Sequence, residues 1–68
     1  MVYDTENVYK YHAPKPGQQE KYEAIRAKAK EFAELVNKTC PDSREKSVCF
    51  TQLETAVMWA NASIARNE

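Results

Sequence analysis

The sequence predicts an all-α protein: an antiparallel two-helix hairpin with a short N-terminal arm, assembled as a symmetric homo-oligomer. Apolar residues recur at steps of three and four along two long stretches, and a proline-containing segment separates these stretches. The second stretch is apolar on more than one side. A chain of 68 residues is one domain, and a single core of that size supplies only about 3–5 kcal/mol, so we expect association to reinforce it.

Residues 1–17 are expected to form the arm. Two prolines and a glycine, Pro14, Pro16 and Gly17, prevent a helix from continuing there. We therefore predict an extended segment with one short turn near its start, packed on a neighbouring element through its aromatic rings. Its aromatic and basic residues are Tyr3, Tyr9, Tyr11, Lys10, His12 and Lys15.

The first long helix is predicted over residues 18–38, a length of roughly 30 Å. Its apolar stripe consists of Tyr22, Ile25, Ala29, Phe32 and Val36. The turn that follows contains Pro41, which disfavours helical angles at the residue before it and suits the first turn of the next helix. Thr39 with Asp42, or Asp42 with Glu45, is expected to form a capping box for that helix.

The second long helix is predicted over residues 42–66, and its apolar residues are too many for one seam. The stripe expected to face the first helix contains Cys49 or Phe50, Leu53, Val57, Ala60 and Ile64. Left outside it are Val48, Ala56, Met58, Trp59, Ala62 and Ala65. An apolar surface of that extent usually marks an interface, and closed symmetry is its usual outcome.

Composition and cysteine content exclude several classes of protein. Ten basic residues balance ten acidic ones, so no overall field draws the chain to duplex nucleic acid or an anionic membrane. No apolar run approaches the roughly 20 residues that span a bilayer, and no targeting segment is visible, so cytosol is the expected location. Cys40 and Cys49 are predicted to be small buried hydrophobes rather than a disulfide, and with His12 they are too few to form a zinc site.

No catalytic motif is present, so the sequence predicts a binding protein without a cofactor rather than an enzyme. The arm places Tyr11 beside His12, and the first helix carries Arg26 and Lys28. Aromatic stacking with nearby cations is a combination that holds nucleobases and phosphates. The plainer alternatives remain open: His12 has a packing role, and the cations form surface pairs such as Glu23 with Arg26.

Three segments resemble a known family: residues 10–14 (KYHAP), residues 22–32 (YEAIRAKAKEF) and residues 51–66 (TQLETAVMWANASIAR). They are similar to the small bacteriophage sponge proteins of the anti-CBASS and anti-Thoeris hairpin-domain family. The likeness covers nearly the whole chain, and the string from Met58 to Arg66 is its most specific part.

The resemblance implies a hexamer of interlocked dimers that sequesters cyclic dinucleotides such as 3',3'-cGAMP in the cytoplasm of an infected bacterial host. It implies that Tyr11 lies against a base and that Lys28 contacts phosphate, with Arg26 as the alternative cation. Some members of the family also hold cyclic trinucleotides through an arginine of the second helix. Ala62 occupies that position here, so the second activity would depend on Asn61 or Arg66.

Two other hypotheses compete with a sponge. One is a protein-binding accessory hairpin that docks through the surface around Trp59, with Met58 and Val48; tryptophan and methionine are frequent anchors of such surfaces. The other is a cyclic-nucleotide hydrolase, which would require a metal or an activated base. Loss of ligand on changing Tyr11 or Lys28 separates the sponge from the docking protein, and recovery of intact ligand excludes the hydrolase.

Overall fold

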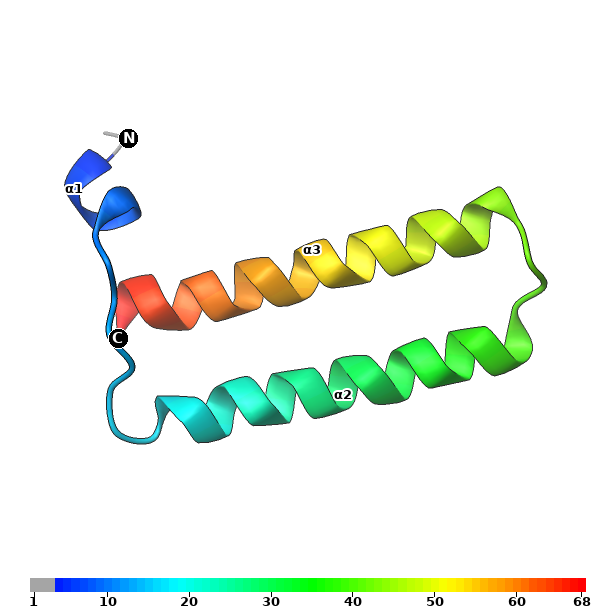
Figure 1. The fold of residues 1–68 in the computed structure, drawn as a ribbon, viewed down its shortest axis with the longest axis horizontal. Helices are drawn as coiled ribbons and strands as arrows, with labels where there is room; N and C mark the ends of the chain where they lie inside the picture. Colours follow the sequence, from blue (N-terminus) through cyan, green and yellow to red (C-terminus); the bar gives the residue numbers. More distant parts are fainter. Residues whose placement is uncertain (1–3) are drawn as a thin grey trace.

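A computed structural model describes residues 4–68, so Tyr3 and its predicted packing lie outside the described residues. Three helices follow in order: α1 (Thr5–Tyr9), α2 (Gln18–Thr39) and α3 (Arg44–Asn67). No strand occurs within residues 4–68, which confirms the predicted all-α class. Helices α2 and α3 run antiparallel, and the arm lies at the end of the hairpin where α3 finishes (Figure 1).

The arm combines one short helix with an extended segment. Asp4 caps α1, because its carboxylate accepts a hydrogen bond from the backbone N–H of Asn7 at 3.1 Å. The backbone is extended at Lys10, and Gly17 then turns the chain into α2 with a φ of 85°. This left-handed conformation favours glycine, which has no Cβ. Gln18 is buried and completes the entry, since its side chain accepts a hydrogen bond from the backbone N–H of Lys15 at 2.9 Å.

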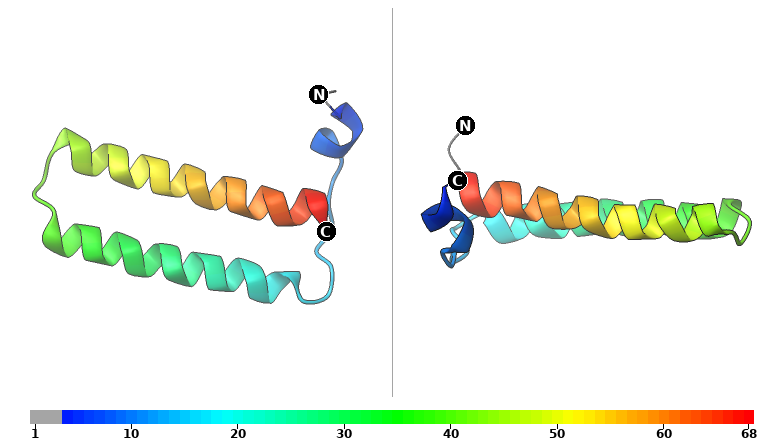
Figure 2. Two further views of the ribbon diagram at one scale, coloured as in Figure 1. Left: turned by 180° about the vertical axis from the view of Figure 1, so that it is seen from behind. Right: turned by 90° about the horizontal axis from the view of Figure 1, so that it is seen from above.

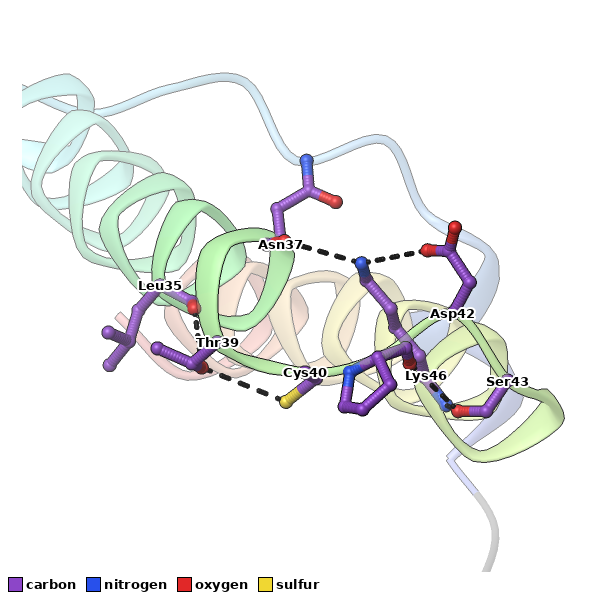
Figure 3. Close-up of polar contacts among 8 residues, drawn as sticks. Leu35, Asn37, Thr39, Cys40, Asp42, Ser43 and Lys46 are labelled. Carbon is purple, nitrogen blue, oxygen red and sulfur yellow. Dashed lines mark hydrogen bonds and ion pairs between the residues drawn. The ribbon is translucent and has the colours of Figure 1, made fainter.

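The turn between the long helices corrects the predicted start of α3, which begins at Arg44 rather than at residue 42. The N-cap is Ser43, whose hydroxyl accepts a hydrogen bond from the backbone N–H of Lys46 at 3.1 Å (Figure 3). Pro41 lies in the connection between the helices and not in the first helical turn of α3. It holds Cys40 in an extended conformation, and Asp42 and Ser43 then lead the chain into α3.

The predicted capping partners have other roles in the same turn. Thr39 ends α2, one residue later than predicted, and its hydroxyl donates a hydrogen bond to the backbone carbonyl of Leu35 at 2.7 Å. Asp42 accepts a hydrogen bond from the ammonium of Lys46 at 3.1 Å. The capping boxes predicted from Thr39 and Asp42 are therefore wrong, and a serine one residue later performs the capping.

Replacing Ser43 by alanine is expected to lower the free energy of unfolding by about 1 kcal/mol, because the N–H of Lys46 loses its acceptor. Thermal unfolding followed by circular dichroism measures the change. Ser47→Ala is the matched control, since Ser47 is exposed within the same helix and should change stability by less than about 0.5 kcal/mol. Equal effects of the two substitutions would contradict the assignment of the cap.

The seam between α2 and α3 is thin. Val36, at 6% exposure, is the one buried apolar residue among residues 4–68, while most other seam residues are half-buried. The half-buried seam residues are Tyr22, Ile25 and Ala29 of α2 and Cys49, Phe50, Leu53, Val57, Ala60 and Ile64 of α3. Phe32 was predicted to lie in the seam, but its side chain is 49% exposed and Ala33 is the less exposed of the two. With about 3.6 residues per turn, the position one turn after Ala29 falls between these residues.

Large apolar side chains remain exposed outside the seam, as the sequence predicts for α3. Trp59 is 65% exposed and Met58 is 68% exposed, and Val48 and Leu35 are also exposed. The two cysteines differ: Cys49 is half-buried, whereas Cys40 is exposed in the turn, so the prediction of a buried Cys40 is wrong. Both are free. Within residues 4–68, neither long helix has the length and apolar character needed to cross a bilayer.

Candidate functional site

The arm is attached to α3 where that helix ends. The side-chain amide of Asn7 donates a hydrogen bond to the backbone carbonyl of Arg66 at 3.4 Å. His12 closes the arm on itself, because its Nε2 lies 2.8 Å from the backbone carbonyl of Asn7. These contacts bring two predicted site residues, His12 and Arg66, to one end of the hairpin, joined through Asn7.

A second set of contacts fastens the arm where it enters α2. The ammonium of Lys15 donates to the backbone carbonyl of Glu68, and the ammonium of Lys21 pairs with the Glu68 carboxylate. The amide of Gln18 donates to the same carboxylate at 3.4 Å. The hydrogen bond from Lys21 is the largest of the effects that hold the pKa of Glu68 below its ordinary value, so this carboxylate is ionised at neutral pH.

Tyr11 lies between these two sets of contacts. Its side chain is 82% exposed, so the ring is available to a ligand or to another protomer. Three residues separate it from Asn7 on one side and from Lys15 on the other. The sequence predicted Tyr11 as the stacking residue, and the structure places it on a short segment that is held at both ends.

Arg26 and Lys28 lie on different sides of α2. Residues two positions apart in the sequence of a helix are about 200° apart around its axis. Arg26 and Lys28 therefore cannot serve one pocket of the same protomer. Arg26 is eleven residues before Asn37 and shares its side of α2, whereas Lys28 is seven residues before Leu35 and shares the opposite side. Figure 3 shows Asn37 and Leu35 pointing to opposite sides of α2.

The linker of the arm lies on the same side as Arg26. Seen along the hairpin from the turn, the segment that precedes α2 passes on the side to which Asn37 points (Figure 3), and the view from above shows the same segment displaced from the plane of the two long helices (Figure 2). Tyr11 belongs to this segment. Within one protomer, therefore, Arg26 shares a face with the arm, and Lys28 does not.

A shallow groove runs along the face that carries Arg26. One hollow is lined by Glu23, Arg26, Ala27, Ala29, Lys30 and Val57. The next is lined by Ala29, Lys30, Ala33, Leu53, Glu54, Val57 and Met58. Because the two hollows share three residues, they form one groove between α2 and α3 with an apolar floor. Its edge carries two cations, Arg26 and Lys30, and two carboxylates, Glu23 and Glu54. We refer to it as the interhelical groove.

Asn61 lies about one helical turn beyond Val57 and Met58 on α3, in line with this groove. Its Oδ1 atom is buried and has no hydrogen-bond partner among the residues that the structure describes. A buried acceptor without a partner costs free energy. A donor from a ligand or from another protomer would remove that cost.

Lys28 forms a surface ion pair. The sequence left such a pairing open as the plainer role for the cations of α2. Its ammonium lies 3.3 Å from the carboxylate of Glu31, and the two side chains are 81% and 66% exposed. Pairs this exposed contribute little to stability. The corresponding pair of Glu23 with Arg26 does not occur in the described part of the chain, where the other ion pairs are Lys21 with Glu68 and Lys46 with Asp42.

Sequence reasoning did not single out Asn7, Gln18 or Glu68, although these residues attach the arm. Their contacts join positions about fifty to sixty residues apart, and periodicity reports local structure only. In residues 4–68, no group of three or more histidine, cysteine, aspartate or glutamate side chains is arranged to hold a metal ion.

Comparison with known proteins assigns the family. A family model described as "Acb2/Tad1, hairpin domain" matches residues 3–65. No curated protein and no solved structure matches the chain. The match covers nearly all of the sequence, including the arm and both long helices. The chain therefore belongs to the Acb2/Tad1 hairpin-domain family of anti-CBASS and anti-Thoeris sponges, whose general activity is the binding of cyclic nucleotides in anti-defence.

Proposed function

We propose that this protein sequesters cyclic dinucleotides such as 3',3'-cGAMP without cleaving them and so blocks CBASS-type signalling in the cytoplasm of the infected bacterial host. The observation that carries the proposal is the exposed ring of Tyr11 on a fastened arm, whose backbone passes on the side of α2 to which Asn37 points and which Arg26 shares by helical spacing. The ring offers a stacking surface for a base. The guanidinium offers paired donors to a phosphate.

Arg26 is better supported than Lys28 as the phosphate-binding cation. It lies at the edge of the interhelical groove, on the side of α2 along which the linker that carries Tyr11 passes. It also has no carboxylate partner among the described residues, whereas Lys28 pairs with Glu31. Lys28 remains the candidate for a pocket formed on the opposite face, between protomers, beside the exposed Leu35.

The symmetry of the ligand favours a site shared by two protomers. A cyclic dinucleotide has two phosphates and approximate two-fold symmetry, so an isologous dimer can present the same tyrosine and arginine to each half. The exposed Trp59 and Met58 supply apolar surface for such an assembly, which we propose to be a hexamer. Enclosure between protomers strengthens charge-assisted contacts to phosphate by excluding water.

A second, trinucleotide site is proposed near the end of α3, where Asn61 and Arg66 stand on either side of Ala62. The unpartnered Oδ1 of Asn61 would accept a hydrogen bond from an N–H or O–H group of the ligand. His12 lies in the same region through its contact with Asn7. That contact engages Nε2 with a backbone carbonyl, which supports a positioning role for this histidine over acid–base chemistry.

The experiment that tests sequestration is recovery of the ligand. The protein is incubated with 3',3'-cGAMP overnight, separated from free ligand by filtration, and digested with protease. Chromatography with mass detection is expected to return the cyclic dinucleotide with unchanged mass, in an amount that rises with protein concentration. A linear dinucleotide or mononucleotides in the digest would contradict the proposal and support the hydrolase hypothesis.

The alternative function is docking on another protein through Trp59 and its neighbours. Exposure of 65% for Trp59 and 68% for Met58 is the observation that favours it. If Trp59 belongs to a docking surface, its substitution leaves the mass of the assembly unchanged. If it belongs to a self-association surface, its substitution lowers that mass.

A further inference from the structure

We propose that five residues form a clasp that holds the arm in its ligand-binding position, and that Asn7 and Glu68 are therefore positioning residues for the nucleotide site. The clasp consists of Asn7, Lys15, Gln18, Lys21 and Glu68. This inference rests on the proposed function, because it names what sets the affinity of that site.

The first half of the clasp fixes the arm before Tyr11. Asn7 donates to the carbonyl of Arg66 in the last turn of α3, where helix carbonyls have no partner within the helix. The backbone carbonyl of the same residue lies 2.8 Å from Nε2 of His12, the residue next to Tyr11. One asparagine thus connects the end of α3 to the immediate neighbour of the stacking ring.

The second half fixes the arm after Tyr11. Glu68 receives Lys21 and Gln18 on its carboxylate and Lys15 on its backbone carbonyl. Gln18 is buried and also accepts from the backbone N–H of Lys15, so the segment that enters α2 is bonded to both long helices. The linker that carries Tyr11 is therefore held at both ends, although the ring itself contacts solvent.

A segment held in this way loses little conformational freedom when a ligand binds. If the clasp opens, the arm adopts the binding-competent position for a smaller fraction of the time, and the observed affinity falls by that fraction. Pro14 and Pro16 already restrict the linker. The clasp adds the attachment that orients this stiff segment relative to α2 and α3.

The clasp has a defined dependence on pH. The contact with Lys21 lowers the pKa of Glu68 in the folded protein. The stabilisation of the clasp by the ionised Glu68 carboxylate is therefore complete above the pKa of a free glutamate, about 4.3. This stabilisation is lost as the pH falls through the lower pKa that Glu68 has in the folded state. At neutral pH the carboxylate is charged and the clasp is closed.

The test compares Glu68→Ala with Asp42→Ala, which removes an ion pair of the same type at the opposite end of the hairpin. Isothermal titration calorimetry measures the Kd of 3',3'-cGAMP, and nitrogen-15 relaxation reports the mobility of the amides of residues 10–13. Glu68→Ala is expected to raise the Kd by about three- to tenfold, as the competent fraction falls to about a third to a tenth. It should also make residues 10–13 more mobile, without changing the mass of the assembly. Asp42→Ala should change neither quantity.

Two further variants distinguish positioning from a general structural role. Asn7→Ala with Glu68→Ala opens both halves and should raise the Kd beyond either single change. Lys21→Glu with Glu68→Lys exchanges the charges and should restore most of the affinity lost in Glu68→Ala. An unchanged Kd in Glu68→Ala with wild-type mobility in the arm overturns the clasp while leaving the proposed function intact. No binding by the wild-type protein overturns the proposed function and, with it, the role of the clasp.

Discussion

Arg26→Ala is expected to weaken binding of 3',3'-cGAMP by roughly 10- to 100-fold, corresponding to the loss of about 1.5–3 kcal/mol from a charge-assisted contact. The reason is geometric: Arg26 lies at the edge of the interhelical groove, on the side of α2 along which the linker that carries Tyr11 passes. Lys28→Ala is the matched control, since it removes an equal charge from the other side of the same helix. Calorimetry on both variants measures the difference.

The opposite result would relocate the site. If Lys28→Ala abolishes binding and Arg26→Ala leaves it within about twofold, the ligand lies on the face that also carries Leu35, and the arm must reach it from another protomer. Circular dichroism accompanies both measurements. Both side chains are exposed, so neither substitution is expected to change the helical content.

Trp59→Ala is expected to reduce the mass of the assembly at micromolar concentration, because a buried tryptophan at an interface typically contributes 2 kcal/mol or more, about 30-fold in the dissociation constant. In the single hairpin this side chain is 65% exposed and contributes little to the seam. Gln52→Ala is the matched control, being an exposed residue seven positions earlier on the same side of α3. Light scattering coupled to size-exclusion chromatography measures both masses.

An unchanged mass in Trp59→Ala would contradict self-association through this surface. The large exposed apolar residues would then be available to another protein, as the docking hypothesis requires. A fall in mass in both variants would indicate that the whole side of α3, and not Trp59 alone, holds the protomers together.

Periodicity predicted the two long helices because their apolar residues follow a local rule, and the structure agrees except where that rule is ambiguous. The seam position after Ala29 falls between Phe32 and Ala33, and packing against α3 selects the smaller side chain. The start of α3 was also ambiguous, since Thr39, Asp42 and Ser43 are all good caps. The extended conformation of Cys40 before Pro41 leaves Ser43 as the residue in position to cap.

The candidate site was less accessible to sequence reasoning. Tyr11 could be singled out as an aromatic residue beside cations, but the side of α2 that faces the arm depends on the path of the linker through Gly17. The attachment of that linker depends on Asn7 and Glu68, whose partners lie far along the chain. Such contacts have no local signature, because surface asparagine and glutamate are ordinary in any amphipathic helical protein.

The measurement that tests the central claim most directly is native mass spectrometry of the wild-type protein and of Tyr11→Ala, each alone and with a panel of cyclic di- and trinucleotides. The account predicts a wild-type hexamer that gains three 3',3'-cGAMP molecules of unchanged mass, and a Tyr11→Ala hexamer of the same size that gains none. A wild-type assembly that takes up no member of the panel, or a Tyr11→Ala protein that binds as fully as the wild type, would contradict it.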